Sequence, residues 1–160
     1  MKSKSNPFQM MLVFLALACL PGGLQAQDKG EIGVFAGGVK MFLDEAIAPH
    51  IGGNVLLSVR RRIMIGPEIY LAPGDRFRRV NVVGRFEYSL YDKGALRPYV
   101  VAAGGFFREL DKQIDYVHYE ELYGGGLGLK IRIKRLELVS EAMLGNNELP
   151  RLSFGARFAF

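Results

Sequence analysis

Few residues in this 160-residue sequence could carry acid–base chemistry. It contains two histidines, His50 and His118, and a single cysteine, Cys19. A serine nucleophile needs a base within hydrogen-bond reach of its hydroxyl. His50 and Ser58 share a face of one predicted strand, but eight residues of extended chain place them about 27 Å apart. Because His118 falls in a predicted polar loop and the metal ligands are scattered, the sequence predicts no enzyme, metal site or cofactor.

Charged side chains recur at alternate positions of segments that are otherwise apolar. Successive side chains of an extended chain point to opposite faces, so the charges share one face and the apolar residues the other. If these segments close into a small barrel, its lumen is just wide enough for side chains to fill it. Charges buried in such a lumen need partners. We therefore expect a salt-bridged, largely closed lumen, with narrow conduction as the alternative. The predicted members are Glu68, Arg85, Glu87, Lys130, Arg132, Glu137, Glu141 and Arg157.

A second group of charges, Arg76, Arg78 and Arg79, clusters at a predicted outer loop that begins A-P-G-D. Exposed charges usually contribute little, which favours a solvated loop. Guanidinium groups also suit phosphate, so contact with lipopolysaccharide at an outer rim is the alternative hypothesis. The longest predicted loop, Glu109 to His118, could contact a host or another cell, because loops carry function more often than scaffolds do.

The first 26 residues have the layout of a secretory signal peptide. Lys2 and Lys4 precede an apolar run from Met10 to Leu20, which is too short to span a membrane as a helix. Ala26 supplies the small residue at the expected cleavage site. Lipidation of Cys19 is a weaker alternative, because the residues before this cysteine depart from the usual lipoprotein signal.

The mature chain, residues 27–160, is predicted to form one β-barrel domain. It has no apolar run long enough for a transmembrane helix, and a closed barrel is the other structure that satisfies every backbone group in lipid. Its 19 basic and 16 acidic side chains form no aromatic-spaced basic patch, so nucleic-acid binding is not indicated. Eight segments alternate in hydrophobicity: Gly30–Lys40, His50–Arg60, Arg62–Leu71, Arg79–Tyr91, Arg97–Arg108, Tyr119–Ile133, Leu136–Leu144 and Pro150–Phe160.

The connections add local expectations. Those after the second, fourth and sixth segments are short and the others generally longer, as in bacterial outer-membrane barrels. Pro67 cannot donate to a ladder, which predicts a bulge or local defect. Gly94 is expected to adopt positive φ in a turn. Tyr91, Tyr99 and Phe160 are predicted to form the periplasmic aromatic girdle.

Three stretches carry a resemblance to a known family. They are L-R-P-Y-V-V-A-A-G-G-F at Leu96 to Phe106, Y-G-G-G-L-G-L-K at Tyr123 to Lys130, and the last segment, which ends on Phe160. The mature chain resembles the small eight-stranded outer-membrane β-barrels of the OmpA/OmpX type. The resemblance implies that the barrel-assembly machinery recognises Phe158 and Phe160, which can equally face lipid. Because the sequence ends on Phe160, we expect no appended peptidoglycan-binding domain, unlike in the two-domain members.

These observations together predict an all-β, eight-stranded antiparallel up-and-down transmembrane barrel in the outer membrane. Its partners would be outer-membrane lipid, lipopolysaccharide and the assembly machinery, and its role structural or one of cell-surface interaction. One alternative is a soluble periplasmic barrel, with apolar residues inside around an apolar ligand. The other is a lipid A-modifying enzyme, which the isolated histidines disfavour. The sequence identifies no ligand, partner cell or oligomeric state.

Overall fold

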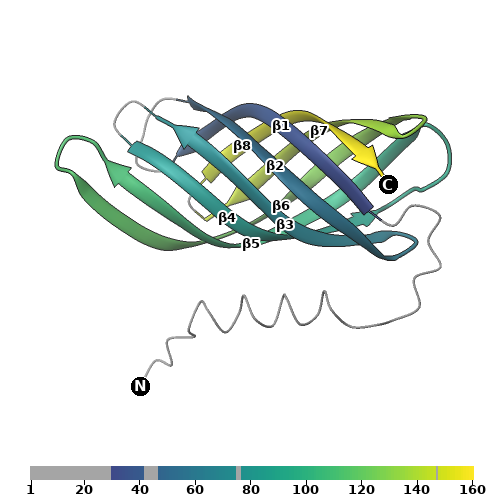
Figure 1. Ribbon diagram of the computed structural model, residues 1–160, viewed down its shortest axis with the longest axis horizontal. Coiled ribbons are helices and arrows are strands. Elements are labelled where there is room, and N and C mark those ends of the chain that lie inside the picture. Colours follow the sequence, from purple (N-terminus) through teal and green to yellow (C-terminus); the bar gives the residue numbers. More distant parts are fainter. Residues whose placement is uncertain (1–29, 42–46, 75–76, 147) are drawn as a thin grey trace, which may run out of the picture.

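A computed structural model describes residues 30–41, 47–74, 77–146 and 148–160. Each strand pairs antiparallel with the next and β8 pairs with β1, so the sheet closes into a barrel (Figure 1). The predicted eight-stranded antiparallel barrel is confirmed, while the predicted leader lies outside the described residues. No helix in the described ranges is long and apolar enough to cross a membrane. The strands are β1 (Gly30–Met41), β2 (Ile47–Arg60), β3 (Ile63–Pro73), β4 (Phe77–Ser89), β5 (Leu96–Asp111), β6 (Tyr116–Ile133), β7 (Leu136–Gly145) and β8 (Glu148–Ala159).

The two ends of the barrel differ. The end that holds Gly30, Phe160 and the connections 61–62, 90–95 and 134–135 is called the turn end here, and the opposite end the loop end (Figure 1). At the turn end, Gly30 and Phe160 exchange backbone hydrogen bonds of 3.1 and 3.0 Å, which seal the first strand to the last. Gly94 has a φ of 83°, as predicted for its turn.

The predicted alternation of connection lengths is wrong. The β4–β5 connection at the turn end, 90–95, is longer than the loop-end connections 74–76 and 112–115. Most of the predicted loop from Glu109 to His118 is strand, because β5 and β6 continue to pair as far as Asp111 and Tyr116. The asymmetry of the barrel therefore resides in strand length, and the β5–β6 hairpin projects beyond its neighbours at the loop end (Figure 1).

Pro67 does not cause a bulge. Asn54 faces Glu68 and Leu57 faces Ile65, so the register of β2 against β3 is the same on both sides of the proline. The ladder is interrupted at the two β2 residues between these pairs, which is a local defect of the kind expected where an N–H is missing. A proline therefore removes a ladder bond here and leaves the register intact.

Tyr99 lies inside the barrel with 1% of its surface exposed, so its predicted place in the aromatic girdle is wrong. Its partner across the ladder is Gly128. A Cβ on Gly128 would lie 2.1 Å from Cζ of the tyrosine ring, so the glycine makes room for the ring inside. Tyr91 and Phe160 are exposed at the turn end, where the girdle was predicted.

Candidate functional site

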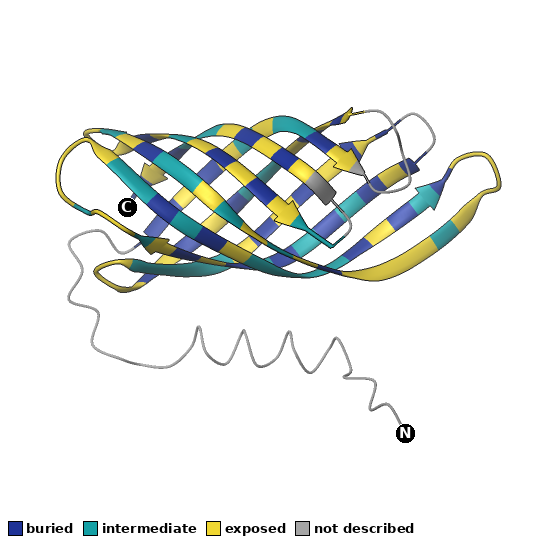
Figure 2. Ribbon diagram, turned by 180° about the vertical axis from the view of Figure 1, so that it is seen from behind, coloured by how far each residue is buried: buried dark blue, intermediate teal, exposed yellow. Residues whose placement is uncertain are grey.

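Charged side chains fill the turn-end and central parts of the lumen. Each has 6% or less of its surface exposed. They alternate with exposed residues along their strands, which gives the checkerboard of burial in Figure 2. We call this set the ionic network: Glu31 on β1, Glu68 on β3, Arg85 and Glu87 on β4, Lys130 on β6, Glu137 and Glu141 on β7, and Arg151 and Arg157 on β8.

Arg85 is the centre of the ionic network. Its guanidinium lies 2.7 Å from the Glu68 carboxylate, 2.6 Å from Glu87, and also in contact with Glu141. Arg151 approaches two of the same carboxylates from β8, at 2.9 Å from Glu68 and 3.3 Å from Glu141. Two arginines from different strands thus share two carboxylates, so the removal of either leaves buried negative charge.

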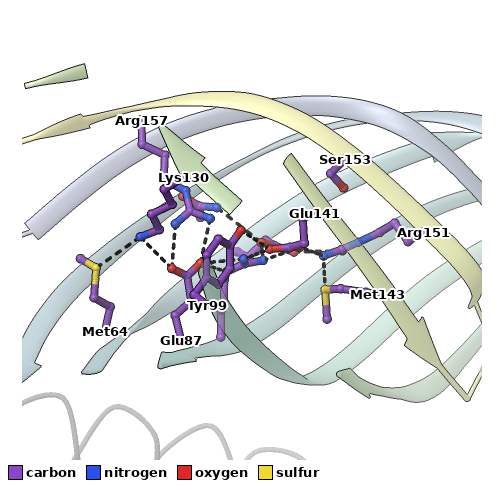
Figure 3. Close-up of polar contacts among 12 residues, drawn as sticks. Met64, Glu87, Tyr99, Lys130, Glu141, Met143, Arg151, Ser153 and Arg157 are labelled. Atoms are coloured by element: carbon purple, nitrogen blue, oxygen red, sulfur yellow. Dashed lines mark hydrogen bonds and ion pairs between the residues drawn. The ribbon is translucent and has the colours of Figure 1, made fainter. Parts of the chain in front are cut away.

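Lys130 and Arg157 extend the ionic network to the turn end. Lys130 Nζ lies 2.9 Å from Glu87, and Arg157 lies 2.8 Å from the same carboxylate (Figure 3). The two bases also share Glu31, at 2.8 and 3.2 Å. Glu137 lies 3.7 Å from Lys130. Because these charges are almost fully removed from water, their mutual pairing is what makes their burial tolerable.

Neutral donors bring the remaining two strands into contact with the ionic network. The Tyr99 hydroxyl on β5 donates to Glu141 at 2.8 Å, and the Asn54 amide on β2 donates to Glu68 at 3.4 Å. Figure 3 shows the Tyr99 ring between Glu87 and Glu141. All eight strands therefore contribute a side chain to one polar network.

Two small voids lie beside this network. One of about 10 Å³ is bordered by Asn54, Glu68 and Ser153, and one of about 20 Å³ by Tyr70 and Arg151. A void must offer roughly 10–15 Å³ to hold one water molecule. The two voids are thus of a size for single waters, far below that of a small-molecule ligand.

Aromatic rings occupy the lumen on the loop-end side of the ionic network. Centroid distances are 6.3 Å between Phe35 and Tyr70 and 5.8 Å between His50 and Tyr70. Phe107 packs in the same buried cluster. The Arg151 guanidinium lies 4.6 Å from the Tyr70 ring centroid, where the two parts of the lumen meet. We call Phe35, His50, Tyr70 and Phe107 the aromatic plug.

One buried ion pair covers the aromatic plug towards the loop end. Arg79 donates to Glu109 at 2.9 Å from Nε and 2.6 Å from Nη2. The Arg79 guanidinium also lies 3.9 Å from the Phe107 ring centroid. An arginine that both pairs with a carboxylate and stacks on a ring is held in place from two sides.

The structure brings together a histidine and a serine that the sequence analysis did not connect. His50 Nε2 lies 2.9 Å from Ser153 Oγ, across the lumen face of β1. The distance suits a nucleophile and base, but both residues are buried inside the lumen. Within the described residues, His50 Nδ1 has no hydrogen-bond partner, so no acid orients the imidazole. The pair joins β2 to β8 and lacks both the third member and the access of a catalytic site.

The predicted arginine cluster at the outer loop does not hold together. Arg79 is 2% exposed and faces inward, because β4 begins at Phe77, before the predicted strand start. This position for Arg79 corrects the prediction that it lies at the outer rim. Arg78 is exposed, and Arg76 lies outside the described residues. His118 lies in β6 and not in a loop, with 46% of its side chain exposed and Glu120 3.6 Å away.

The structure places seven of the eight predicted lumen charges among the buried residues, and Arg132, half-buried at the turn-end mouth, points its Nε to within 3.9 Å of Glu137. The sequence analysis left out Glu31, Arg151 and the Arg79–Glu109 pair. The alternation of side chains could have identified Glu31 and Arg151. Each is separated by an odd number of positions from apolar residues assigned to the outer face, so each must point to the inner face.

The outer surface of the barrel is covered by exposed apolar side chains from all eight strands. We call this surface the apolar belt. Phe158 and Phe160, the predicted assembly signal, belong to it with 47% and 52% of their surfaces exposed. Other members are Ile32, Val34, Ile51, Val55, Leu57, Val59, Ile69, Leu71, Phe86, Tyr88, Leu96, Leu127, Ile131, Ile133, Leu136, Leu138, Leu144, Leu152 and Phe154.

The projecting hairpin leaves one strand edge uncovered. Residues Tyr116–Tyr123 of β6 pair with β5, but the ladder with β7 begins only at Gly124. Asn146 ends that ladder by bonding to the backbone of Tyr123 and to the carbonyl of Glu121 at 2.9 Å. Beyond this point the backbone of β6 has no neighbouring strand in the described part of the chain, so its N–H and C=O groups form a free edge.

Comparisons with known proteins agree with the fold. No protein-family model and no curated protein sequence matches this chain. The N-terminal β-barrel domain of Pseudomonas aeruginosa OprF has a TM-score of 0.63 and 18% identity, over 84% of this chain and 100% of that one. Neisserial surface protein A has a TM-score of 0.65 and 11% identity, over 82% and 96%. A de novo designed transmembrane β-barrel has a TM-score of 0.54 and 14% identity, over 86% and 100%. The predicted resemblance to small eight-stranded outer-membrane barrels is confirmed at the level of fold.

Proposed function

We propose that this protein is an integral β-barrel of the bacterial outer membrane that acts in cell-surface interaction and has no enzymatic activity. The observation that carries the proposal is the apolar belt around a closed barrel whose interior is charged. Such a barrel satisfies every backbone group without an edge in the membrane and presents hydrocarbon side chains to lipid. The leader at residues 1–26, which lies outside the described residues, would deliver the chain to the periplasm.

The soluble alternative requires the opposite arrangement. A barrel that carries an apolar ligand in water needs apolar residues inside and polar residues outside. Here the buried set includes Glu68, Arg85 and Glu137, whereas Ile32, Leu127 and Phe154 are exposed. The prediction of an apolar interior is therefore wrong, and with it the reason for expecting a lumen ligand.

The filled lumen supports a role at the surface over conduction or catalysis. Ion pairs cross the lumen from β4 to β7 and β8, and the neighbouring voids hold about one water each. The His50–Ser153 pair is buried inside the lumen, away from the lipid-facing surface on which lipid A would lie. Sites for partners are then left to the ends of the barrel and its outer surface.

The projecting hairpin is the feature best suited to a surface interaction. Its free edge, the β6 residues Tyr116–Glu120 beyond the Asn146 contacts, contains neither lysine nor proline, which are among the residues that commonly prevent strand addition. An extended segment of a partner can pair with such an edge through main-chain hydrogen bonds. Arg78, exposed at the same end, would contact lipopolysaccharide phosphates, and Phe158 and Phe160 would be recognised by the barrel-assembly machinery.

The membrane assignment is tested by comparing unboiled and boiled samples of the mature protein from membrane fractions on a detergent gel. A closed barrel keeps its hydrogen-bonded ring in cold detergent, so the unboiled band should migrate differently from the boiled band. One band in both lanes, together with recovery from the soluble periplasmic fraction, would overturn the proposal. The matched control is Asn146→Ala, which removes a loop-end contact outside the apolar belt and should keep the shift.

A further inference from the structure

The turn end of the barrel carries a large excess of basic side chains. In the described connections 61–62, 90–95 and 134–135 and the strand ends beside them, Asp92 is the one exposed or half-buried acidic side chain. Arginines or lysines occur at each of the three connections. We call them the basic collar: Arg60, Arg61, Arg62, Lys93, Arg97, Arg132, Lys134 and Arg135.

Backbone hydrogen bonds fix these connections relative to one another. The Arg132 N–H donates to the Ala95 carbonyl at 2.8 Å, which ties the end of β6 to the β4–β5 connection. The Ala159 N–H donates to the Arg135 carbonyl at 2.9 Å, which ties the β6–β7 turn to β8. The charges of the basic collar are therefore held around one rim of a rigid barrel.

Internal pairing uses only some of these charges. Arg97 lies 3.5 Å from Glu137, and Arg61 lies 2.8 Å from Asp92. Desolvation raises the pKa of Asp92, but Arg61 and Arg62 outweigh it and lower that pKa below its ordinary value, so the carboxylate stays charged.

Four members of the collar have no such partner. Among the residues that the structure describes, Arg60, Lys93, Lys134 and Arg135 make no ion pair, and all four are exposed. Each of the three connections, taken with the strand ends beside it, therefore carries at least one unpaired positive charge.

The basic collar lies directly beside the apolar belt. Ile133 and Leu136 flank the basic turn Lys134–Arg135 and are 53% and 41% exposed. Tyr91 and Leu96 flank residues 92–95 of the β4–β5 connection in the same way, at 51% and 54%. A phospholipid combines acyl chains with a phosphate at one end, and this rim presents apolar side chains with cations immediately beyond them.

The loop end lacks this arrangement. Its exposed described charges include the bases Lys40, Arg78 and Arg108, but also the acids Asp115, Glu120 and Glu121. With Lys112 these charges nearly cancel, whereas those of the turn end are strongly positive, so the loop end offers a matched control for the turn end.

We propose that the basic collar binds the phosphate headgroups of anionic phospholipids in the leaflet that faces the turn end. Guanidinium groups match phosphate oxygens in pairs, and ammonium groups add point charge. The inference rests on the proposed membrane location, because the collar reaches headgroups only when the apolar belt lies in lipid. It assigns a ligand class to this rim, namely phosphatidylglycerol-type lipids.

The test uses the mature barrel in phosphatidylcholine vesicles that contain a trace of spin-labelled lipid. The fraction of motionally restricted spin label is compared for phosphatidylglycerol and phosphatidylcholine labels. We expect a preference of about threefold for phosphatidylglycerol, falling towards one in high salt, because basic side chains near a membrane surface attract anionic lipid. The variant Arg60→Gln/Lys93→Gln/Arg135→Gln removes one unpaired charge from each connection and should lose most of the preference.

The matched control is Lys40→Gln/Arg108→Gln/Lys112→Gln, which removes the same charge from exposed positions at the loop end and should keep the preference. Loss of the preference in the control alone, or equal loss in both variants, would overturn the assignment to the collar. So would the absence of any preference in the unmodified barrel. The gel shift is measured on the same samples: a shifted band without lipid preference refutes this inference alone, whereas the absence of a shift refutes the membrane location.

Discussion

The ionic network and the aromatic plug fill one lumen by different means. In the network, Arg85 touches three carboxylates and no apolar cluster encloses it. In the plug, rings pack against one another, and polar pairs such as Arg79–Glu109 and His50–Ser153 lie beside them. The network is thus a mesh in which each charge has several partners, whereas the plug is a set of separate contacts.

The comparison bears on how each part should respond to substitution. Removing one member of a buried ion-pair mesh leaves its partners charged and unpaired in a low-dielectric lumen. The free energy of unfolding then falls by more than the net contribution of the pair itself. Removing one contact from the plug leaves the ring packing in place. We therefore expect sensitivity to concentrate in the ionic network, and the following predictions test this order from the largest effect to the smallest.

Arg85→Met should cause the largest loss, because Glu68, Glu87 and Glu141 lose a shared counterion. We expect the free energy of unfolding in detergent micelles to fall by about 4 kcal/mol, from urea titration followed by gel shift. Arg78→Met on the exposed side of β4 is the control and should change it little. Adding Glu141→Gln should restore part of the loss; a double variant as unstable as the sum of the singles would contradict the mesh.

Arg79→Met should cost about half as much, roughly 2 kcal/mol, because it breaks the ion pair with Glu109 near the loop-end opening, away from the shared carboxylates of the ionic network. The same urea titration measures it. The double variant Arg79→Met/Glu109→Met should recover most of the stability, since both charges are then gone. If Arg79→Met proved as costly as Arg85→Met, the two parts of the lumen would not differ in the way we describe.

Tyr99→Phe removes one donor from Glu141 and keeps the ring over Gly128. Glu141 retains Arg85 and Arg151, so we expect a loss of only about 1 kcal/mol. Tyr91→Phe, at an exposed position, is the matched control for loss of a hydroxyl. A loss from Tyr99→Phe as large as that from Arg85→Met would show that the hydroxyl, and not the charges, organises the mesh.

Ser153→Ala should have the smallest effect, about 0.5 kcal/mol or less, because a water in the adjoining void can replace the hydroxyl against His50. The control is Ser140→Ala, at an exposed position on the outer face of β7, the strand next to β8. The readout is again the urea midpoint. A loss above about 2 kcal/mol would place His50 and Ser153 within the mesh and remove the boundary between the two parts.

The alternation of side chains was enough to predict the strands, their faces and most of the ionic network. Glu68, Arg85 and Glu141 each stand between outward apolar residues, so period two alone places them inside. It failed at Tyr99, because both faces of β5 are apolar and the deciding feature is the glycine opposite, at position 128. The pattern of one strand contains no information on the space that small residues of the partner strand leave for a large side chain.

Strand ends and cross-lumen partners were also beyond the pattern. Asp111 and Tyr116 extend their strands because each supplies the ladder of the other, although the local sequence is polar. Ser153 meets His50 only because the closed barrel places β2 and β8 on either side of β1. Such contacts depend on the closure and tilt of the barrel, which no local spacing encodes.

The distribution of the ionic network along the chain has a consequence for the order of folding. Arg157 contacts Glu31 across 126 positions of sequence, and β8 supplies both Arg151 and Arg157. Before β8 docks, Arg85 and Lys130 are the only bases of the ionic network beside its five carboxylates, and Arg97 and Arg132 reach Glu137 alone at the turn-end mouth. The inner face of the nascent sheet therefore carries an excess of negative charge, which the arginines of β8 neutralise. Such non-local contacts form late, so closure and neutralisation of the lumen become a single cooperative event.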